Sequence, residues 1–409
     1  MNRKRTFLFG ILASLSVFTS GCWSERQLTD IAMVAAVAID LNEEGQYEAS
    51  YQFFNPGNIA GGLQGGGGGQ SPPVAVYTAT GDTIMEVHGN MSRKISREPY
   101  YSHTNLVVIG EEVAKKEGIA PALEAFDRGS QFRVTTSVVI AHGVKAKDLV
   151  TTLAALDKVP SQKIMQTLES TEKALGENIN IDLQETITAL VSPGREPIIS
   201  GFTLKGDPKA GTKQESLQAT EIPTSIEADG NAIFKNGKLV GWIEGIDARS
   251  ALWVLDRIQS TTITTAWAGQ KDAISYRVVR QKTNVSADMK NGKPHVSVAV
   301  HMEGDIGEVT VPVNLKDPET LDKIENDISK QLKKEIETSI RHTKKRKTDI
   351  FGFGEVFHRA EPKEWKKIEK KWEDEVFPNL AVDVSVESYI RRTGLRNNSY
   401  LSEMKKGKE

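Results

Sequence analysis

Cysteine is almost absent from the chain, because Cys22 is the only one among 409 residues. A single cysteine excludes an internal disulfide framework and any metal site built from several cysteines. The folded part must therefore be stabilised by a packed core. Hydrophobic residues make up 38% of the chain, which is enough to form such a core.

Long hydrophobic runs are also missing, since a helix that spans a bilayer needs roughly 20 apolar residues. The run at residues 31–39 is far shorter, and we interpret it as a buried strand. Another short run, at residues 7–18, follows the basic residues Arg3, Lys4 and Arg5. A basic region, a short apolar region and then small residues are typical of an export signal.

The export signal ends beside Cys22, which is preceded by the small residues Ser20 and Gly21. An ordinary secretory site needs no cysteine, whereas a lipoprotein site needs the thiol to receive a diacylglyceryl group. Thr19 departs from the usual pattern, which has Leu at that position. The alternative, a leftover cysteine beside an ordinary cleavage site, is disfavoured because the chain has no other cysteine. We predict that residues 1–21 are a lipoprotein signal peptide and that Cys22 carries the lipid, with palmitate among its acyl chains.

Motifs of common enzymes are missing as well. The chain has neither a Gly-x-Ser-x-Gly elbow nor a His-Glu-x-x-His helix, and none of its seven histidines lies four residues from another. The glycine-rich residues 61–69 lack the Lys-Ser/Thr of a phosphate-binding loop, so we interpret residues 61–73 as a flexible surface loop. We expect no catalytic residue, no metal site and no cofactor. The net charge of −2 gives no reason to expect nucleic acid as a partner.

Strands and helices are predicted in a mixed order rather than in a regular βαβ repeat. This favours an α+β class with mixed, largely antiparallel sheets packed with helices. The expected strands are at residues 31–39, 47–53, 74–77, 106–109, 134–141, 274–279, 296–302 and 382–387. The expected longer helices are at residues 83–94, 247–258, 317–347 and 362–377. Asn236-Gly237 predicts a tight hairpin between strands at 231–234 and 238–242.

The length of the chain predicts more than one domain. About 390 residues remain after the signal peptide, too many for one ordinary core, so the protein is expected to be multidomain. We interpret the polar segment 206–225 as a linker between an N-terminal α+β region, 22–205, and a C-terminal α+β domain, 226–400. The N-terminal region is expected to contain two domains, and residues 401–409 are expected to be disordered.

The helix predicted from Asp317 has a basic end. Its apolar residues recur at spacings of three and four, which predicts one buried stripe. The basic residues at its end are Arg341, Lys344, Lys345, Arg346 and Lys347. Positive charge there complements the helix dipole. Two interpretations stay open: contact with anionic lipid or an acidic partner, and a solvated helix end.

Several clusters of residues, taken in order, resemble one known family. In the first half these are Cys22-Trp23 with Arg26, Leu28 and Asp30, then Ile39-Asp40, Ser92-Arg93-Lys94, Ser102-His103, Ile109-Gly110-Glu111-Glu112, Asp127-Arg128 and Phe132-Arg133. In the second half they are Ala232-Ile233-Phe234-Lys235, Lys238-Leu239-Val240-Gly241, Asp349-Ile350-Phe351-Gly352-Phe353-Gly354, His358, Pro362, Trp365 and Trp372. Each cluster alone is weak, but their order resembles the C-subunit lipoproteins of bacterial spore germinant receptors, the Ger(x)C family. The resemblance covers nearly the whole mature chain, apart from the glycine-rich insertion at 61–69.

The resemblance implies a fold of three α+β domains and no catalytic site. It also implies a lipid-anchored subunit on the outer face of the spore inner membrane, beside polytopic A-type and B-type subunits of a receptor that nutrients trigger. Such a subunit is needed for receptor assembly or for the signalling that starts germination. We interpret the polar residues Arg93, His103, Glu111, Arg128 and Arg133 as structural. The alternative function is a solute-binding lipoprotein that captures a small nutrient, but such proteins usually have two lobes of βαβ units, which this sequence does not predict.

Overall fold

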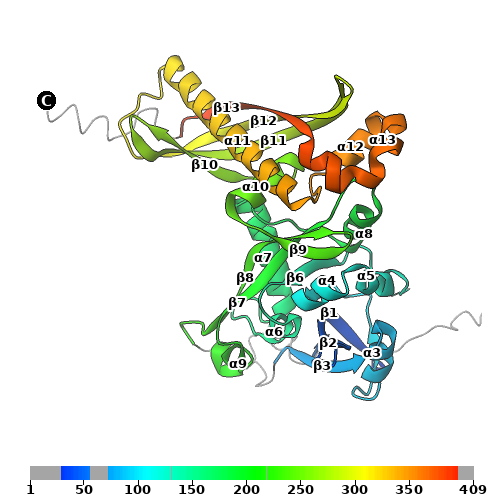
Figure 1. Ribbon diagram of the computed structural model, residues 1–409. Helices are drawn as coiled ribbons and strands as arrows, with labels where there is room; N and C mark the ends of the chain where they lie inside the picture. Colours follow the sequence, from blue (N-terminus) through cyan, green and yellow to red (C-terminus); the bar gives the residue numbers. More distant parts are fainter. Residues whose placement is uncertain (1–28, 56–71, 130, 218, 395–409) are drawn as a thin grey trace, which may run out of the picture.

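The computed structural model describes residues 29–55, 72–129, 131–217 and 219–394. The predicted signal peptide, Cys22, most of the glycine-rich loop and the tail at 401–409 lie outside these residues. Figure 1 shows two parts stacked one on the other, each built on its own sheet. The molecule is a mixed α/β structure in which helices pack on both sheets. The predicted fold class is therefore confirmed, with two sheets.

The first sheet has nine strands in the order β3-β2-β1-β5-β6-β7-β8-β9, with β4 paired to β1. Their bounds are β1 (Ile31–Leu41), β2 (Tyr47–Phe54), β3 (Val74–Gly81), β4 (Glu98–Tyr100), β5 (Leu106–Gly110), β6 (Ser137–Ala141), β7 (Ile198–Gly206), β8 (Thr224–Lys235) and β9 (Lys238–Ile243). The central strands β1, β5, β6 and β7 run parallel, and the short β4 also pairs parallel with β1. The strands β2, β3, β8 and β9 pair antiparallel with their neighbours. The centre is parallel although the sequence pattern favoured largely antiparallel pairing.

Helices cover both faces of this sheet. They are α3 (Ile84–Met91), α4 (Glu111–Lys116), α5 (Ala120–Asp127), α6 (Ala146–Thr151), α7 (Pro160–Ala174) and α8 (Leu183–Val191), followed by the short α9 (Pro208–Gly211) and η1 (Gln214–Leu217). Val37 and Val107 belong to the core shared with α3, α4 and α5, whereas Ala38 and Val108 face α6 and α7. Strands buried on both faces read as continuous apolar runs rather than as alternating ones. This explains why residues 31–39 are apolar throughout.

The polar segment 206–225 lies within the first sheet rather than between the two sheets. It connects β7 to β8, which pair antiparallel from Ile198↔Ile233 to Gly206↔Thr224. The β8–β9 hairpin predicted at Asn236-Gly237 therefore completes the first sheet, with both turn residues at positive φ. A polar connection between adjacent strands has the same composition as a linker between domains, so composition alone does not distinguish them.

The second sheet has four strands in the order β10-β11-β12-β13. Their bounds are β10 (Thr261–Trp267), β11 (Gln270–Lys290), β12 (Lys293–Val309) and β13 (Ala381–Arg392). β11 and β12 form a long antiparallel hairpin, and β13 returns parallel to β12 after a helical crossover. The crossover contains α11 (Pro318–Arg346), whose predicted stripe is confirmed as buried from Ile324 to Ile340.

The remaining helical segments lie near the junction of the two parts (Figure 1). They are α10 (Gly245–Val254), α12 (Phe353–Ala360), α13 (Pro362–Ile368), η2 (Glu369–Lys371), η3 (Trp372–Val376) and η4 (Phe377–Asn379). The single helix expected at 362–377 is thus divided into an α-helix and turns of 3₁₀ and π type. Apolar spacing predicts a helical path, but it does not distinguish α from 3₁₀ or π turns.

Candidate functional site at the junction of the two sheets

Asp349 organises the junction from a fully buried position after α11. One of its carboxylate oxygens accepts the backbone N–H of Phe353 at 3.1 Å. The other accepts the backbone N–H of Gly354 at 2.8 Å and the indole Nε1–H of Trp372 at 2.9 Å. Burial raises the pKa of Asp349 to about 6, against the effect of these hydrogen bonds. The cluster 349–354 and Trp372, noted in the sequence, therefore form one polar network inside the core.

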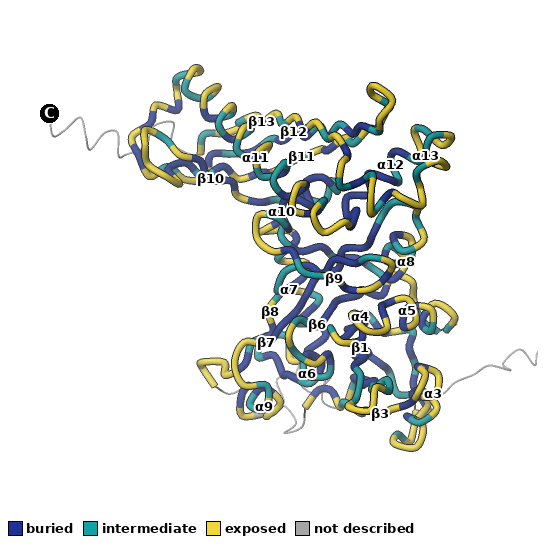
Figure 2. The backbone as a smooth tube through the Cα atoms, viewed as in Figure 1, coloured by how far each residue is buried: buried dark blue, intermediate teal, exposed yellow. Residues whose placement is uncertain are grey.

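The two parts touch through glycines at this point. Gly194, in the loop before β7, lies so close to Gly354 that a Cβ on either residue would sit 2.6 Å from the other's Cα. Gly194 also has a positive φ of 67°, which favours glycine. Figure 2 shows buried backbone running through the junction around β9. The first sheet and the α12 segment are therefore packed backbone to backbone.

Two more carboxyl groups, the half-buried Glu373 and the buried Glu196, lie beside Asp349. Glu373 accepts the backbone N–H of Asp349 at 3.0 Å, and Glu196 accepts the backbone N–H of Asn236 at 2.8 Å. Burial, and then the charges of Asp349 and Glu196, raise the pKa of Glu373 to about 8. Burial also raises the pKa of Glu196. Lys235 is the neighbouring cation, but its ammonium group pairs with Asp374 at 2.7 Å.

We expect the acid cluster to make stability depend on pH. Because the folded-state pKa of Glu373 lies above its ordinary value of 4.5, its contribution to stability is complete below about pH 4.5 and falls as the pH rises to about 8. Glu373→Gln keeps an acceptor for Asp349 but cannot ionise. At pH 9 the variant should therefore be more stable than the wild type by on the order of 2–4 kcal/mol. At pH 5 this advantage should be much smaller, because Glu373 is then protonated in the folded wild type.

Thermal melting followed by circular dichroism between pH 5 and pH 9 checks this prediction. Glu375→Gln is the matched control, since Glu375 is an exposed neighbour that pairs with Lys371 at 3.2 Å. The control should follow the wild-type curve. If the melting temperature of Glu373→Gln changes with pH as steeply as that of the wild type, the raised pKa of Glu373 is not the cause of the pH dependence.

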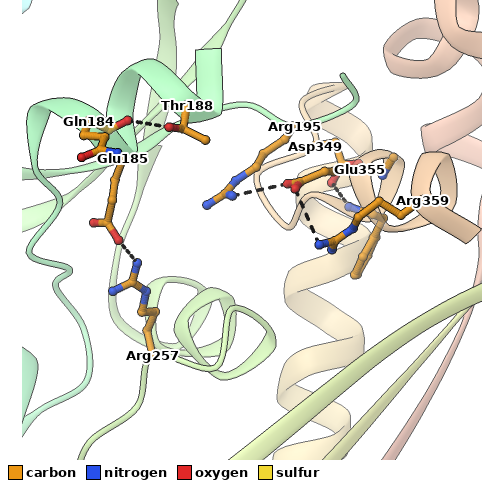
Figure 3. Close-up of polar contacts among 10 residues, drawn as sticks. Gln184, Glu185, Thr188, Arg195, Arg257, Asp349, Glu355 and Arg359 are labelled. Carbon is orange, nitrogen blue, oxygen red and sulfur yellow. Dashed lines mark hydrogen bonds and ion pairs between the residues drawn. The ribbon is translucent and has the colours of Figure 1, made fainter. Parts of the chain in front are cut away.

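A cavity of about 360 Å³ opens beside this cluster, between the two parts. Arg195 from the first part and Arg257 and Arg359 from the second line it (Figure 3). Glu355 lies between two of these guanidinium groups, 3.4 Å from Arg195 and 4.0 Å from Arg359. Arg257 pairs with Glu185 of α8. Ion pairs thus connect the two parts at both sides of the cavity.

Comparison with known proteins identifies the family of this chain. A family model described as Spore germination protein N-terminal domain matches residues 24–204, and one described as Spore germination B3/GerAC like, C-terminal matches residues 229–394. The chain is 42% identical to Spore germination protein KC of Bacillus subtilis (strain 168), over 96% of this chain and 97% of that protein. The chain belongs to the spore germination GerAC family.

More distant members of the GerAC family match at similar length. The chain is 26% identical to Putative spore germination protein YfkR of Bacillus subtilis (strain 168), over 93% of this chain and 95% of that protein. The crystal structure of the GerBC protein matches with a TM-score of 0.55 at 17% identity, covering 87% of this chain and 96% of that chain. That likeness shows a shared fold. None of these family descriptions and names denotes an enzyme.

Residues that carried the resemblance to this family have structural roles near the first sheet. Asp40, at the end of β1, accepts the backbone N–H groups of Ala146 and Lys147 at 2.9 Å each and thereby caps α6. A Cβ at Gly110 would lie 2.5 Å from the Asp40 carboxylate, so glycine leaves room for this cap. Glu111 accepts the indole N–H of Trp242 at 3.2 Å and pairs with Lys115 at 2.8 Å. The structural interpretation of Glu111 agrees with these contacts.

The basic end of α11 is divided between internal contacts and solvent. Lys344 donates to the backbone oxygen of Leu380, and burial lowers its pKa. Arg346 donates to the backbone oxygen of Trp242 at 2.6 Å. The exposed arginines and lysines of the stretch are Arg341, Lys345, Arg346 and Lys347. Contact of this stretch with lipid or with a partner stays a prediction.

Two observations bear on the other expectations about membranes and metals. Among the described residues, no helix has the length and apolar character needed to cross a membrane.

Within the same residues, ligand atoms of His142, Asp229 and Glu244 lie within 4.8 Å of one another. The sequence search missed this group, because it tested histidines at helical spacing and these residues come from three separate segments. Cys22 lies outside the described residues, and its lipidation stays a prediction.

Proposed function

We propose that this protein is the lipid-anchored, non-catalytic subunit of a nutrient germinant receptor, on the outer face of the spore inner membrane. The identity of 42% with Spore germination protein KC along nearly the full chain carries this proposal. The junction agrees with a structural role, since Arg195 pairs with Glu355 and Arg257 pairs with Glu185 between the two parts. In this role the subunit is needed for receptor assembly or for the signal that triggers germination.

The anchor is Cys22 in this proposal. One acyl chain gives marginal membrane binding, whereas the two chains of a diacylglyceryl cysteine anchor a protein stably. β1 begins at Ile31, and the intervening residues span at most about 30 Å when fully extended. The first sheet therefore stays close to the bilayer surface, within reach of polytopic A-type and B-type subunits. The exposed cations Arg341, Lys345 and Lys347 would be available there to acidic headgroups or an acidic partner surface.

Cys22→Ala tests the anchor and the function together. Without the thiol no diacylglyceryl group can be added, so the chain should lose incorporation of labelled palmitate. It should also leave the spore membrane fraction, or remain as the uncleaved precursor. Germination in response to the nutrient of its receptor should fall at least about ten-fold, since an unanchored subunit loses its high local concentration at the membrane.

Thr19→Leu is the matched control in the same signal. It brings the segment before Cys22 closer to the usual lipoprotein pattern, so processing, membrane retention and germination should equal or exceed those of the wild type. Normal retention and normal germination of the Cys22→Ala variant would contradict the proposal. Copurification of the wild-type chain with an A-type and a B-type subunit would support the proposed partners.

A further inference from the structure

We propose that His142, Asp229 and Glu244 form a binding site for a divalent transition-metal ion of the Zn²⁺ class. Their ligand atoms lie within 4.8 Å of one another, and the imidazole Nδ1 of His142 lies 3.0 Å from a carboxylate oxygen of Asp229. Zn²⁺ binds nitrogen and carboxylate ligands at about 2.1 Å, so two ligand atoms of a tetrahedral site lie about 3.4 Å apart. A small movement of the Glu244 side chain would bring its carboxylate oxygen to this spacing from the other two ligand atoms.

Three separate segments supply the ligands. His142 follows β6, Asp229 lies where the pairing of β7 and β8 is irregular, and Glu244 follows β9 at the N-cap of α10. The side chains of His142 and Asp229 are 22% and 34% exposed, and Glu244 is exposed. An ion can therefore enter from solvent, and a water molecule can complete its coordination.

The imidazole of His142 is held in place before any ion binds. Its ring stacks on the indole of Trp242, with the ring centres 3.7 Å apart and an interplanar angle of 15°. Trp242 is fixed in turn by its hydrogen bond to Glu111, and the backbone N–H of His142 donates to the oxygen of Phe202 at 2.8 Å. Because the imidazole is already ordered, it loses less conformational freedom when an ion binds.

Two glycines make the close approach of these groups possible. A Cβ at Gly201 would lie 2.4 Å from the Trp242 ring and 2.5 Å from the backbone oxygen of Asp229. A Cβ at Gly230 would lie 2.7 Å from Cγ of Glu244, and Gly230 also has a positive φ of 65°. The backbone at Gly201 and Gly230 thus leaves room for the side chains of Trp242 and Glu244.

The charge and the donor types select the class of ion. Within the described ranges, neither Asp229 nor Glu244 pairs with a lysine or an arginine, so two carboxylates beside an imidazole favour a divalent cation. Ca²⁺ prefers six to eight oxygen ligands, whereas a mixed nitrogen and oxygen set suits Zn²⁺, Co²⁺ or Ni²⁺. Because Glu244 begins α10, which packs on α11, a bound ion would tie the first sheet to the second part.

The proposal is tested on the full chain, which is purified without a polyhistidine tag and kept in mild detergent. Cys22→Ala is introduced in every sample so that the thiol cannot bind the ion. Titration with Zn²⁺ by calorimetry should show saturable binding of one ion per chain. Co²⁺ should quench part of the tryptophan fluorescence, since Trp242 stacks on one of the ligands.

Four variants separate this site from other weak sites. His142→Ala and Glu244→Gln should each weaken Zn²⁺ binding at least about ten-fold, and Glu244 is exposed, so its variant should fold normally. Trp242→Phe keeps an aromatic ring beside His142 but loses the hydrogen bond to Glu111, so it should bind Zn²⁺ more weakly and lose the quenching by Co²⁺. His301→Ala is the matched control, because His301 is an exposed histidine paired with Glu387 at 3.1 Å. Absence of saturable binding, or unchanged affinity in Glu244→Gln, would overturn the proposal.

Discussion

Asp349→Ala should lower the free energy of unfolding by on the order of 3–5 kcal/mol. The substitution leaves three buried donors without an acceptor: the backbone N–H groups of Phe353 and Gly354, and the indole N–H of Trp372. Each buried donor without a partner costs about 1–3 kcal/mol. Removing a fully buried carboxyl group offsets part of this loss, because burial of that group is itself costly. If the second part, which contains Asp349, unfolds as one unit, the midpoint of its thermal unfolding should fall by about 10 °C.

Asp349→Asn is the matched control for this loss. Its amide oxygen can still accept the hydrogen bonds from the N–H of Gly354 and the indole N–H of Trp372. Its NH₂ group cannot accept the hydrogen bond from the N–H of Phe353. The loss of stability should therefore be about half that of Asp349→Ala. Near-ultraviolet circular dichroism reports directly on the packing of Trp372. Equal melting of the alanine variant and the wild type would show that the network does not hold the junction.

Gly354→Ala should destabilise the protein by about 2–3 kcal/mol, although alanine is the better helix former. The added Cβ would lie 2.6 Å from Cα of Gly194 and 2.7 Å from the indole nitrogen of Trp372. Neither neighbour is the end of a flexible side chain, so the two parts must move apart. Overpacking of this kind typically costs about 1–3 kcal/mol, and here it also disturbs the bond between Trp372 and Asp349.

Gly89→Ala separates this packing effect from helix propensity. Gly89 lies in α3, and a Cβ there would meet no atom within 4 Å. That variant should gain about 0.5–1 kcal/mol. Thermal melting of both variants, with limited proteolysis at the junction, checks the pair. A gain of stability in Gly354→Ala would contradict the close packing of Gly194 against Gly354.

Patterns along the chain predicted many of the individual elements. The apolar run at 31–39 became β1, and the spacing of Ile324, Ile328 and Leu332 marked the buried face of α11. The Asn236-Gly237 turn was found as expected between β8 and β9. These features depend on neighbouring residues alone, through backbone preference and the period of side-chain burial, so a single sequence contains the necessary information.

The pairing of distant segments was not predictable in the same way. Polar composition at 206–225 did not reveal that β7 and β8 lie side by side, and the apolar strands did not reveal their parallel order. The acid cluster of Asp349, Glu373 and Glu196 also joins three separate segments. Its raised pKa values follow from burial and mutual proximity, which no local spacing expresses.

The sequence alone predicted an export signal that ends at the single cysteine, the mixed order of strands and helices, and the family resemblance. Each of these is a property of residue types in order along the chain. The tertiary structure alone decided which strands form one sheet, which carboxyl groups share the core of the junction, and that His142 meets Asp229 and Glu244. These are contacts between residues far apart in sequence, and they exist only after folding has brought the segments together.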